Sequence, residues 1–204
     1  VERSRGLGDV YKRQNVQKGR LREHHQFGVE CFGAPTPATD AEIISLADTA
    51  LKRLGITEVK VHINSIGCPN CRPKYYDMLK GYLNQHKDCL CEDCLNRLDR
   101  NPMRILDCKQ ESCKKVAADA PIALDYLCDD CREHFEKVKT YLDDMGIAYE
   151  IDTNIVRGLD YYTKTVFEFV STNIGAQGTI CGGGRYDGLI SQPVSYTHLT
   201  LPTT

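Results

Sequence analysis

The chain has 204 residues, of which 41% are hydrophobic and 26% charged, and its formal net charge is -2. This length accommodates one large domain or two small ones with a sizeable core. No apolar stretch is long enough to cross a bilayer or to act as a signal peptide, so the sequence predicts a cytoplasmic protein without a membrane partner. The nearly neutral charge excludes nucleic-acid binding through a general basic excess, so any RNA contact must come from locally placed Lys and Arg.

The two ends of the chain resemble one inverted DNA element. Residues 9–14 can be encoded by GAT GTG TAT AAG AGA CAG, and the opposite strand in another frame can encode residues 194–199. This resembles a transposon-end adaptor from sequencing-library preparation, and two natural unstructured tails are the alternative. We therefore predict that residues 1–14 and 193–204 are adaptor-like artefacts that do not belong to the fold.

The body of the fold is predicted to begin with a hairpin. Residues 27–32 alternate around Gly28 and Glu30 as a strand does, and a polar, arginine-rich stretch at residues 17–26 precedes them. This pattern indicates a hairpin that carries a charged loop.

A helix and a strand follow within the first body segment, residues 15–67. Thr39 and Glu42 have the spacing of a capping box, and apolar residues then recur at helical spacing until Gly55. The pattern predicts a helix over residues 40–54. Alternation over residues 59–63 then predicts a strand buried on one face.

Residues 68–132 have a different character and are predicted to form a small inserted domain, mainly helical. Nine of the eleven cysteines lie here, in short helical patterns rich in charge. In a cytosolic chain, CxxC pairs indicate a metal rather than disulfides. Three CxxC pairs and one looser pair supply eight candidate ligands, namely Cys68, Cys71, Cys91, Cys94, Cys108, Cys113, Cys128 and Cys131.

Two such pairs suffice for one tetrahedral zinc site, so eight thiols make two sites or one site with cysteines left over. The spacing does not decide which pairs combine. The alternative is a helical subdomain with buried, reduced cysteines and no metal.

The second body segment, residues 133–192, is predicted to hold a helix and three strands. Apolar residues at helical spacing end at Gly146, and strand patterns follow at residues 149–152, 165–170 and 179–181. Residues 173–178 are predicted to form the turn between the last two strands. The body is therefore of the α+β class, with strands that we expect to pair antiparallel.

Two motifs of this second segment suit a binding site. Arg157, in the RGLDYY motif of residues 157–162, offers a planar charged fork for a carboxylate or a phosphate. Taken alone, the motif favours an Arg157–Asp160 pair with packed tyrosines over a binding site. The glycine run in residues 182–188 permits close approach of backbone to a ligand, although such runs also serve as turns.

Together, three segments resemble the histidyl-tRNA synthetase family of class II synthetases. Residues 19–30 resemble its motif 2 loop and second strand, residues 156–162 its VRGLDYY signature, and residues 181–189 its GGGRYDGL signature. The resemblance covers essentially all of residues 15–192. It implies a class II antiparallel sheet flanked by helices, and an enzyme that activates histidine with ATP and Mg²⁺ and transfers it to tRNA(His).

The resemblance also implies roles for residues. Gln26 would lie near the α-amino group of histidine, and Glu30 and Tyr162 would meet the two sides of its imidazole ring. Arg157 would contact the histidine carboxylate and the ATP α-phosphate, as the catalytic residue. The remaining implied residues are Arg20, Arg22 and His24 near ATP, Tyr161 beside the substrate, and the backbone of Gly182, Gly183 and Gly184 in the pocket floor.

The chain also departs from the family pattern. His24 stands where an aromatic residue usually covers adenine, and the expected motif 2 arginine falls in the adaptor-like segment. Motif 1, motif 3 and the anticodon-binding domain are not in this sequence. We therefore expect an inactive fragment of an enzyme whose family works as a homodimer.

The inserted domain of the family lies over the tRNA acceptor stem. Lys109, Lys114, Lys115 and Arg132 are therefore candidate phosphate contacts, with a merely solvated charged face as the alternative. Two other functions compete with the synthetase. One is the synthetase-like regulatory subunit of ATP phosphoribosyltransferase, and the other is a zinc-dependent nucleic-acid-binding module.

Overall fold

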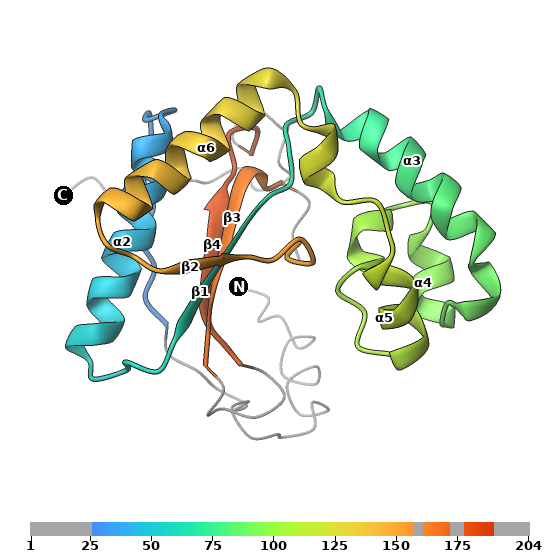
Figure 1. Ribbon diagram of the computed structural model, residues 1–204, viewed down its shortest axis with the longest axis horizontal. Helices are drawn as coiled ribbons and strands as arrows, with labels where there is room; N and C mark the ends of the chain where they lie inside the picture. The colour runs from blue at the N-terminus through green and yellow to red at the C-terminus, as the bar shows by residue number, and fades with distance from the viewer. Residues whose placement is uncertain (1–25, 157–160, 172–177, 190–204) are drawn as a thin grey trace, which may run out of the picture.

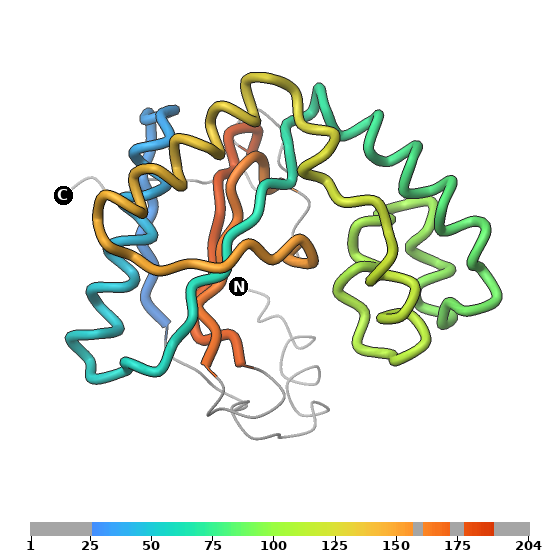
Figure 2. Tube along the Cα trace, viewed as in Figure 1, coloured from blue at the N-terminus to red at the C-terminus, as the bar shows by residue number. Residues whose placement is uncertain are grey.

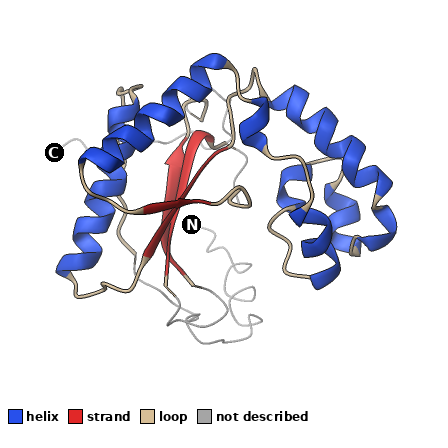
Figure 3. Ribbon diagram, viewed as in Figure 1, coloured by secondary structure: helices blue, strands red, loops and turns tan. Residues whose placement is uncertain are grey.

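The computed structural model describes residues 26–156, 161–171 and 178–189. It has two parts, a sheet with two long helices and a smaller helical lobe at residues 72–127 (Figure 1). All strands of the described residues lie in the sheet part, whereas the lobe consists of helices and loops (Figure 3). This confirms the predicted α+β class with a mainly helical, cysteine-rich insertion.

Four strands form one sheet in the order β2-β1-β3-β4. Their bounds are Lys60–Ser65 for β1, Tyr149–Ile151 for β2, Thr163–Val170 for β3 and Thr179–Arg185 for β4. The pairs β1–β3 and β3–β4 are antiparallel as predicted, but β1 and β2 are parallel. The expectation of purely antiparallel pairing was therefore wrong, because the chain returns from β1 to β2 through a crossover that contains a helix.

Helices α2 (Pro37–Arg53) and α6 (Asp129–Asp144) cover one face of the sheet and pack against each other. Their core includes Ile44, Val138 and Leu142 of the helices and Ile63 and Phe169 of the strands. These five side chains are all but inaccessible to solvent, so this layer supplies much of the hydrophobic stabilisation of the body.

The beginning of α2 differs from the sequence prediction. The helix starts at Pro37, and Thr36 is its N-cap, whose hydroxyl bonds to the Thr39 hydroxyl at 3.3 Å and not to a backbone N–H of the helix. The predicted capping box, Thr39 and Glu42, therefore lies inside the helix. Proline at the first helical position is preorganised for a helix and lacks the N–H that would be unsatisfied there. The helix ends as predicted, before Gly55 at a φ of 78°.

The lobe is built from helices around a hydrophobic core that continues to Ile66, Tyr162 and Val166 of the sheet part. The elements are α3 (Arg72–Gln85), η1 (Lys87–Cys89), α4 (Glu92–Arg97), η2 (Pro102–Ile105), α5 (Glu111–Ala118) and η3 (Ala123–Tyr126). Leu79, Leu83 and Ile105 are completely buried there, together with Cys94 and Cys113. The chain enters the lobe after β1 and leaves it before α6, and these two crossings lie close together (Figure 2).

Residues 26–34 do not form the predicted strand. The aromatic side chains of Phe27 and Phe32 are 75% and 52% exposed. A strand needs a hydrogen-bonded neighbour, and the predicted hairpin partner lies outside the described residues. Residues 26–34 instead face β4 and α2 across a cavity. Within the described ranges, no helix is long and apolar enough to span a membrane.

Candidate functional site

A cavity of about 1020 Å³ lies between β4, α2 and residues 26–34. Tyr162, the glycines of β4, Gln26 and Glu30 all line it, and the Glu30 carboxylate lies beside Tyr186. The structure thus brings together residues that lie more than 130 positions apart in the chain. Tyr162 is buried at its edge, whereas Gln26 and Glu30 are exposed.

Three tyrosine rings form one end of this site. The ring centroids of Tyr161 and Tyr162 lie 4.8 Å apart, and Tyr186 meets Tyr161 edge-on at 5.9 Å. Tyr162 and Tyr186 line the cavity, and Tyr161 packs against both of them. Aromatic contacts of this kind make a rigid apolar wall with polar hydroxyl tips.

Two hydroxyl groups at the cavity, Thr165 Oγ1 and Tyr186 Oη, are buried and make no hydrogen bond of good geometry among the described residues, although the carboxylates of Asp40 and Glu30 lie beside them. Burial raises the pKa of Tyr186, and the neighbouring Glu30 carboxylate raises it further, so the phenol stays protonated. Buried polar groups rarely remain unpaired, because each carries a desolvation cost. A polar ligand or water in the cavity would satisfy both hydroxyls.

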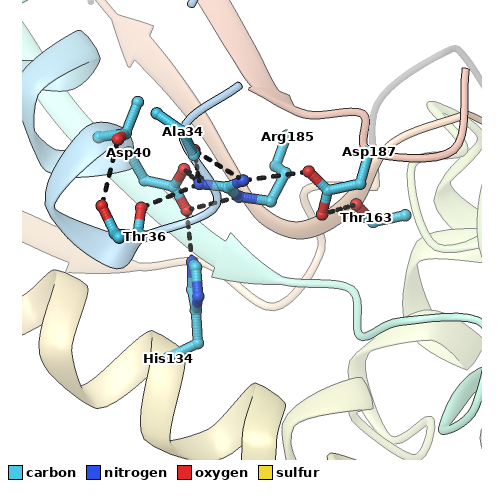
Figure 4. Close-up of polar contacts among 8 residues, drawn as sticks. Ala34, Thr36, Asp40, His134, Thr163, Arg185 and Asp187 are labelled. Atoms are coloured by element: carbon cyan, nitrogen blue, oxygen red, sulfur yellow. Dashed lines mark hydrogen bonds and ion pairs between the residues drawn. The ribbon is translucent and has the colours of Figure 1, made fainter. Parts of the chain in front are cut away.

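A buried ion cluster fixes the wall of the cavity (Figure 4). Arg185 Nη2 lies 2.6 Å from Asp40 Oδ1, and His134 Nε2 lies 2.7 Å from Asp40 Oδ2. Arg185 also pairs with Asp187 at 3.0 Å and donates to the Thr36 carbonyl at 3.0 Å. One guanidinium therefore joins β4 to α2, and Asp40 joins both to α6.

The electrostatics of this cluster favour its charged form. Burial by itself disfavours the Asp40 carboxylate, but hydrogen bonds from His134 and Arg185 and the charge of Arg185 outweigh burial and lower the Asp40 pKa. Burial by itself would lower the pKa of Arg185, but the carboxylates of Asp40 and Asp187 raise it. The cluster consequently holds Arg185 and its neighbour Tyr186 in fixed positions beside the cavity.

The glycine run of residues 182–184 lies inside β4 rather than in a loop after a strand. A Cβ on Gly183 would stand 2.9 Å from the Phe167 ring, and one on Gly184 would stand 2.8 Å from the Thr165 carbonyl oxygen. These glycines therefore let β4 lie close against β3 and Tyr162. Their backbone lines the cavity at the same place.

The segment that leads to Arg157 is anchored by a buried amide. Asn64 Nδ2 donates to the carbonyl oxygens of Ile155 at 3.0 Å and Thr153 at 3.3 Å, and Asn64 Oδ1 accepts from the Ser65 N–H at 2.8 Å. Arg157 itself lies outside the described residues. So do Arg20, Arg22 and His24, the residues expected near ATP, and residues 173–177 of the turn expected at residues 173–178.

Comparison with known proteins decides the family. A family model described as histidyl-tRNA synthetase matches residues 1–194. The chain belongs to the histidyl-tRNA synthetase family. The matched range includes residues 1–14, whose adaptor-like origin stays a prediction.

Individual relatives agree with this assignment. The chain is 60% identical over 183 residues to a histidine–tRNA ligase of Caldanaerobacter subterraneus subsp. tengcongensis, and 62% identical over 181 residues to one of Acetivibrio thermocellus. These matches cover 90% and 89% of the chain but only 44% and 43% of the relatives, so the chain spans less than half of their length. Apo histidyl-tRNA synthetase of S. aureus superposes with a TM-score of 0.60 at 38% identity, over 78% of this chain and 38% of the other.

The synthetase signatures do not account for two groups of cysteines. Cys68, Cys71, Cys128 and Cys131 form one group, and Cys91, Cys94, Cys108 and Cys113 form the other. Within each group the sulfur atoms all lie within 4.8 Å of one another. The division of the chain at residues 68 and 132 remains a prediction, but the first group stands at both of these boundaries.

The basic residues expected over the acceptor stem are spread along the surface. Lys109 pairs with Asp107 and Lys114 with Glu111, each at 3.0 Å, and all four side chains are at least half exposed. Lys115 and Arg132 are also exposed. Such surface pairs contribute little free energy, so these cations remain accessible to a phosphate.

Sequence reasoning missed four features of the site, namely Asn64, Thr165, Tyr186 and the Asp40–Arg185 pair. Tyr186 lies in the GGGRYDGL segment, but only the glycines of that segment were predicted to line the pocket. No local signal could have found the Asp40–Arg185 pair, because 145 positions separate its members.

Proposed function

We propose that the full-length protein of this chain attaches histidine to tRNA(His) after activating it with ATP. The observation that carries this proposal is the single cavity that Gln26, Glu30 and Tyr162 line in a member of the histidyl-tRNA synthetase family. Its polar groups suit histidine, whose imidazole offers one N–H donor and one acceptor nitrogen.

Recognition of the imidazole would use groups of opposite character on its two sides. Glu30 accepts a hydrogen bond from a ring N–H, and a tyrosine hydroxyl of the Tyr161, Tyr162 and Tyr186 group donates to the other nitrogen. A ligand that lacks either group leaves its partner in the occupied pocket unpaired, which is a strong basis for rejection. Gln26 is left to bind the α-amino group.

The chemical step would centre on Arg157. A histidine carboxylate oxygen forms a bond to the ATP α-phosphorus, the bond from this phosphorus to the bridging oxygen breaks, and pyrophosphate leaves with the electron pair. Arg157 stabilises the negative charge that develops on the α-phosphate. Asn64 holds the residues just before Arg157 and is a positioning residue in this scheme. The glycine backbone of β4 leaves space at the pocket floor.

Several further parts belong to this proposal. Arg20, Arg22 and His24 bind ATP, which arrives with Mg²⁺, and the lobe contacts the acceptor stem of tRNA(His). The protein works as a homodimer in the cytoplasm. The cysteines of residues 68–132 hold a structural metal that takes no part in activation. A fragment limited to these 204 residues would not perform the reaction alone.

Glu30→Gln in the full-length protein tests the pocket. A carboxylate only accepts hydrogen bonds, whereas an amide can rotate to present a donor, so we expect weaker binding of the imidazole N–H. Loss of a charge-assisted hydrogen bond of about 1.5 to 3 kcal/mol corresponds to a roughly ten- to hundredfold loss of histidine activation. Histidine-dependent pyrophosphate exchange and ATP affinity should be measured on one preparation.

Glu42→Gln is the matched control, because Glu42 is an exposed carboxylate of α2 that does not line the cavity. It should leave pyrophosphate exchange and both affinities unchanged. A parallel loss of histidine and ATP binding in Glu30→Gln, with a lower melting temperature, would refute the role of Glu30 in the pocket.

A further inference from the structure

We propose that the eight cysteines form two separate zinc sites, a hinge site that clasps both ends of the lobe to the sheet and a lobe site inside it. The hinge site consists of Cys68, Cys71, Cys128 and Cys131. The lobe site consists of Cys91, Cys94, Cys108 and Cys113. This inference deepens the structural metal of the proposed function by assigning ligands, stoichiometry and a task to each site.

The sulfur positions fit single tetrahedral ions. Sγ–Sγ distances are 3.6 Å for Cys68–Cys71, 3.8 Å for Cys68–Cys128 and 3.8 Å for Cys71–Cys131. Zn–S bonds of about 2.3 Å set the sulfurs of a tetrahedron about 3.8 Å apart. A disulfide requires about 2.05 Å, so these are not oxidised pairs. Thiolates on different irons of a multinuclear cluster lie further apart than thiolates on one ion.

The lobe site repeats this arrangement. Its Cys91 and Cys108 sulfurs are also 3.8 Å apart. In each site, the first cysteine donates its backbone N–H to a ligand sulfur, from Cys68 to Cys71 Sγ at 3.1 Å and from Cys91 to Cys113 Sγ at 3.2 Å. Such N–H donors stabilise negative charge on sulfur. In each site, two of the four cysteines are buried and two are partly exposed.

Helix ends and two arginines place positive charge near the hinge site, and Asp129 and Asp130 offset part of it. A divalent ion with four thiolates carries a net charge of -2. Cys71 is the N-cap of α3 and Cys128 is the N-cap of α6, so two long helices direct their positive ends towards the site. Arg72 and Arg132 follow the last cysteine of each CxxC pair. These groups favour a bound anionic centre over four neutral thiols.

The hinge site has a mechanical task because of its place in the chain. Its first pair follows β1 and its second pair begins α6, so one ion joins the chain entering the lobe to the chain leaving it. Gly67 makes this close approach possible, since its φ is 69° and a Cβ there would stand 2.7 Å from Cys71 Sγ. The buried side chains of Cys71, Leu127 and Cys131 pack at this junction, so a metal held by the cysteines would add to an existing apolar contact.

The clasp is connected to the candidate pocket by backbone and side-chain hydrogen bonds. Arg72, next to Cys71, donates to the carbonyl oxygens of Tyr162 and Ile66. Ile66 and Gly67 in turn exchange backbone hydrogen bonds with Lys164, each at 2.9 Å. The hinge site therefore sets the position of the lobe relative to β3, the strand that directly follows Tyr162.

Metal analysis of the reductively purified full-length protein tests the stoichiometry. We expect two zinc ions from these cysteines in the wild type, one in Cys131→Ser, one in Cys94→Ser and none in the double variant. Cys89→Ser is the matched control, because Cys89 is an exposed lobe cysteine outside both groups, and it should keep two. Cys128→His should retain the ion that Cys128→Ser loses, because imidazole is a zinc ligand.

Hydrogen exchange separates the two tasks. In Cys131→Ser, the amides of Ile66 and Lys164 should exchange roughly tenfold faster or more, while in Cys94→Ser the loosening should stay within the lobe. When the metal-free wild type is titrated with Co²⁺, the visible absorption of tetrahedral thiolate coordination should saturate at two equivalents of Co²⁺. This measurement counts the sites without any variant.

Three outcomes would overturn the proposal. These are fewer than two ions in the wild type, iron in place of zinc, or loss of both ions in either single variant, which would mean one shared cluster. Failure of histidine-dependent pyrophosphate exchange with two zinc ions present would count against the proposed function alone.

Discussion

Asn64 shows how one buried side chain connects the sheet with the candidate catalytic segment. It is 1% exposed and uses both its amide donors and its oxygen. An amide is needed at this position because its NH₂ group serves two carbonyl oxygens while its oxygen accepts an N–H. The loop that continues to Arg157 therefore starts from a fixed backbone position.

Asn64→Asp tests this positioning role. A carboxylate has the same shape but cannot donate to the Thr153 and Ile155 carbonyls, so the free energy of unfolding should fall by about 1 to 3 kcal/mol. If Asn64 also orients Arg157, kcat of pyrophosphate exchange should fall more than KM for histidine changes. Both quantities should be measured at a temperature where the variant is fully folded.

Asn84→Asp is the control, since Asn84 is exposed on α3. It should change neither stability nor kinetics appreciably. A stable Asn64→Asp variant with normal kcat would restrict Asn64 to a purely structural role.

At the scale of elements, β4 combines a packing surface with a cavity wall. A Cβ added to Gly184 would lie 2.9 Å from side-chain atoms of both Tyr162 and Val166, in addition to its close approach to the Thr165 carbonyl oxygen. Since a backbone oxygen cannot rotate away, a larger residue must push β4 from β3. The same displacement would move Arg185 and Tyr186, which follow directly.

Gly184→Ala should therefore lower the free energy of unfolding by about 1 to 3 kcal/mol, as expected for overpacking. Gly81→Ala in α3 should act in the opposite direction, because an added Cβ there meets nothing within 4 Å and alanine is the better helix former. Its gain should be about 0.5 to 1 kcal/mol. Denaturant unfolding of both variants checks the two signs, and a neutral Gly184→Ala would show that β4 does not need its glycine there.

At the scale of the whole molecule, the Asp40–Arg185–His134 cluster ties α2, β4 and α6 into one unit. The side chains of Asp40 and Arg185 are 9% and 7% exposed. Removal of one partner from a buried pair leaves the other charge without compensation. Asp40→Asn should lower the free energy of unfolding by on the order of 3 kcal/mol at neutral pH, near the lower end for such pairs because Asp187 still meets Arg185.

The pH dependence follows from the lowered pKa of Asp40. Its ordinary value is 3.8, and the folded value is lower, so its contribution to stability is complete above pH 3.8 and is lost as the pH falls through the folded pKa. Unfolding measured between neutral and strongly acidic pH should show a steeper acid loss in the wild type than in Asp40→Asn. Parallel curves for the two proteins would contradict the assigned pKa direction.

The sequence by itself determined the family, the α+β class and most of the elements. Patterns of period 2 and 3.6 depend on neighbours a few residues away, and for this reason the helices ending at Gly55 and Gly146 and the strand patterns at residues 59–63, 149–152, 165–170 and 179–181 were predictable. The three ordered signatures identified the family even though most of their individual roles stay predictions.

Only the tertiary structure decided how distant residues meet. The CxxC spacing predicted thiolate ligands but could not choose partners, because the choice depends on the path of the chain through the lobe, which brings Cys68 to Cys128 across 60 positions. The parallel pairing of β1 and β2, the glycines within β4 and the Asp40–Arg185 pair have the same origin. The strand predicted at residues 27–32 failed for a related reason: alternation reports only which side chains share a face, whereas a strand also requires a hydrogen-bonded neighbour, and tertiary structure alone provides one.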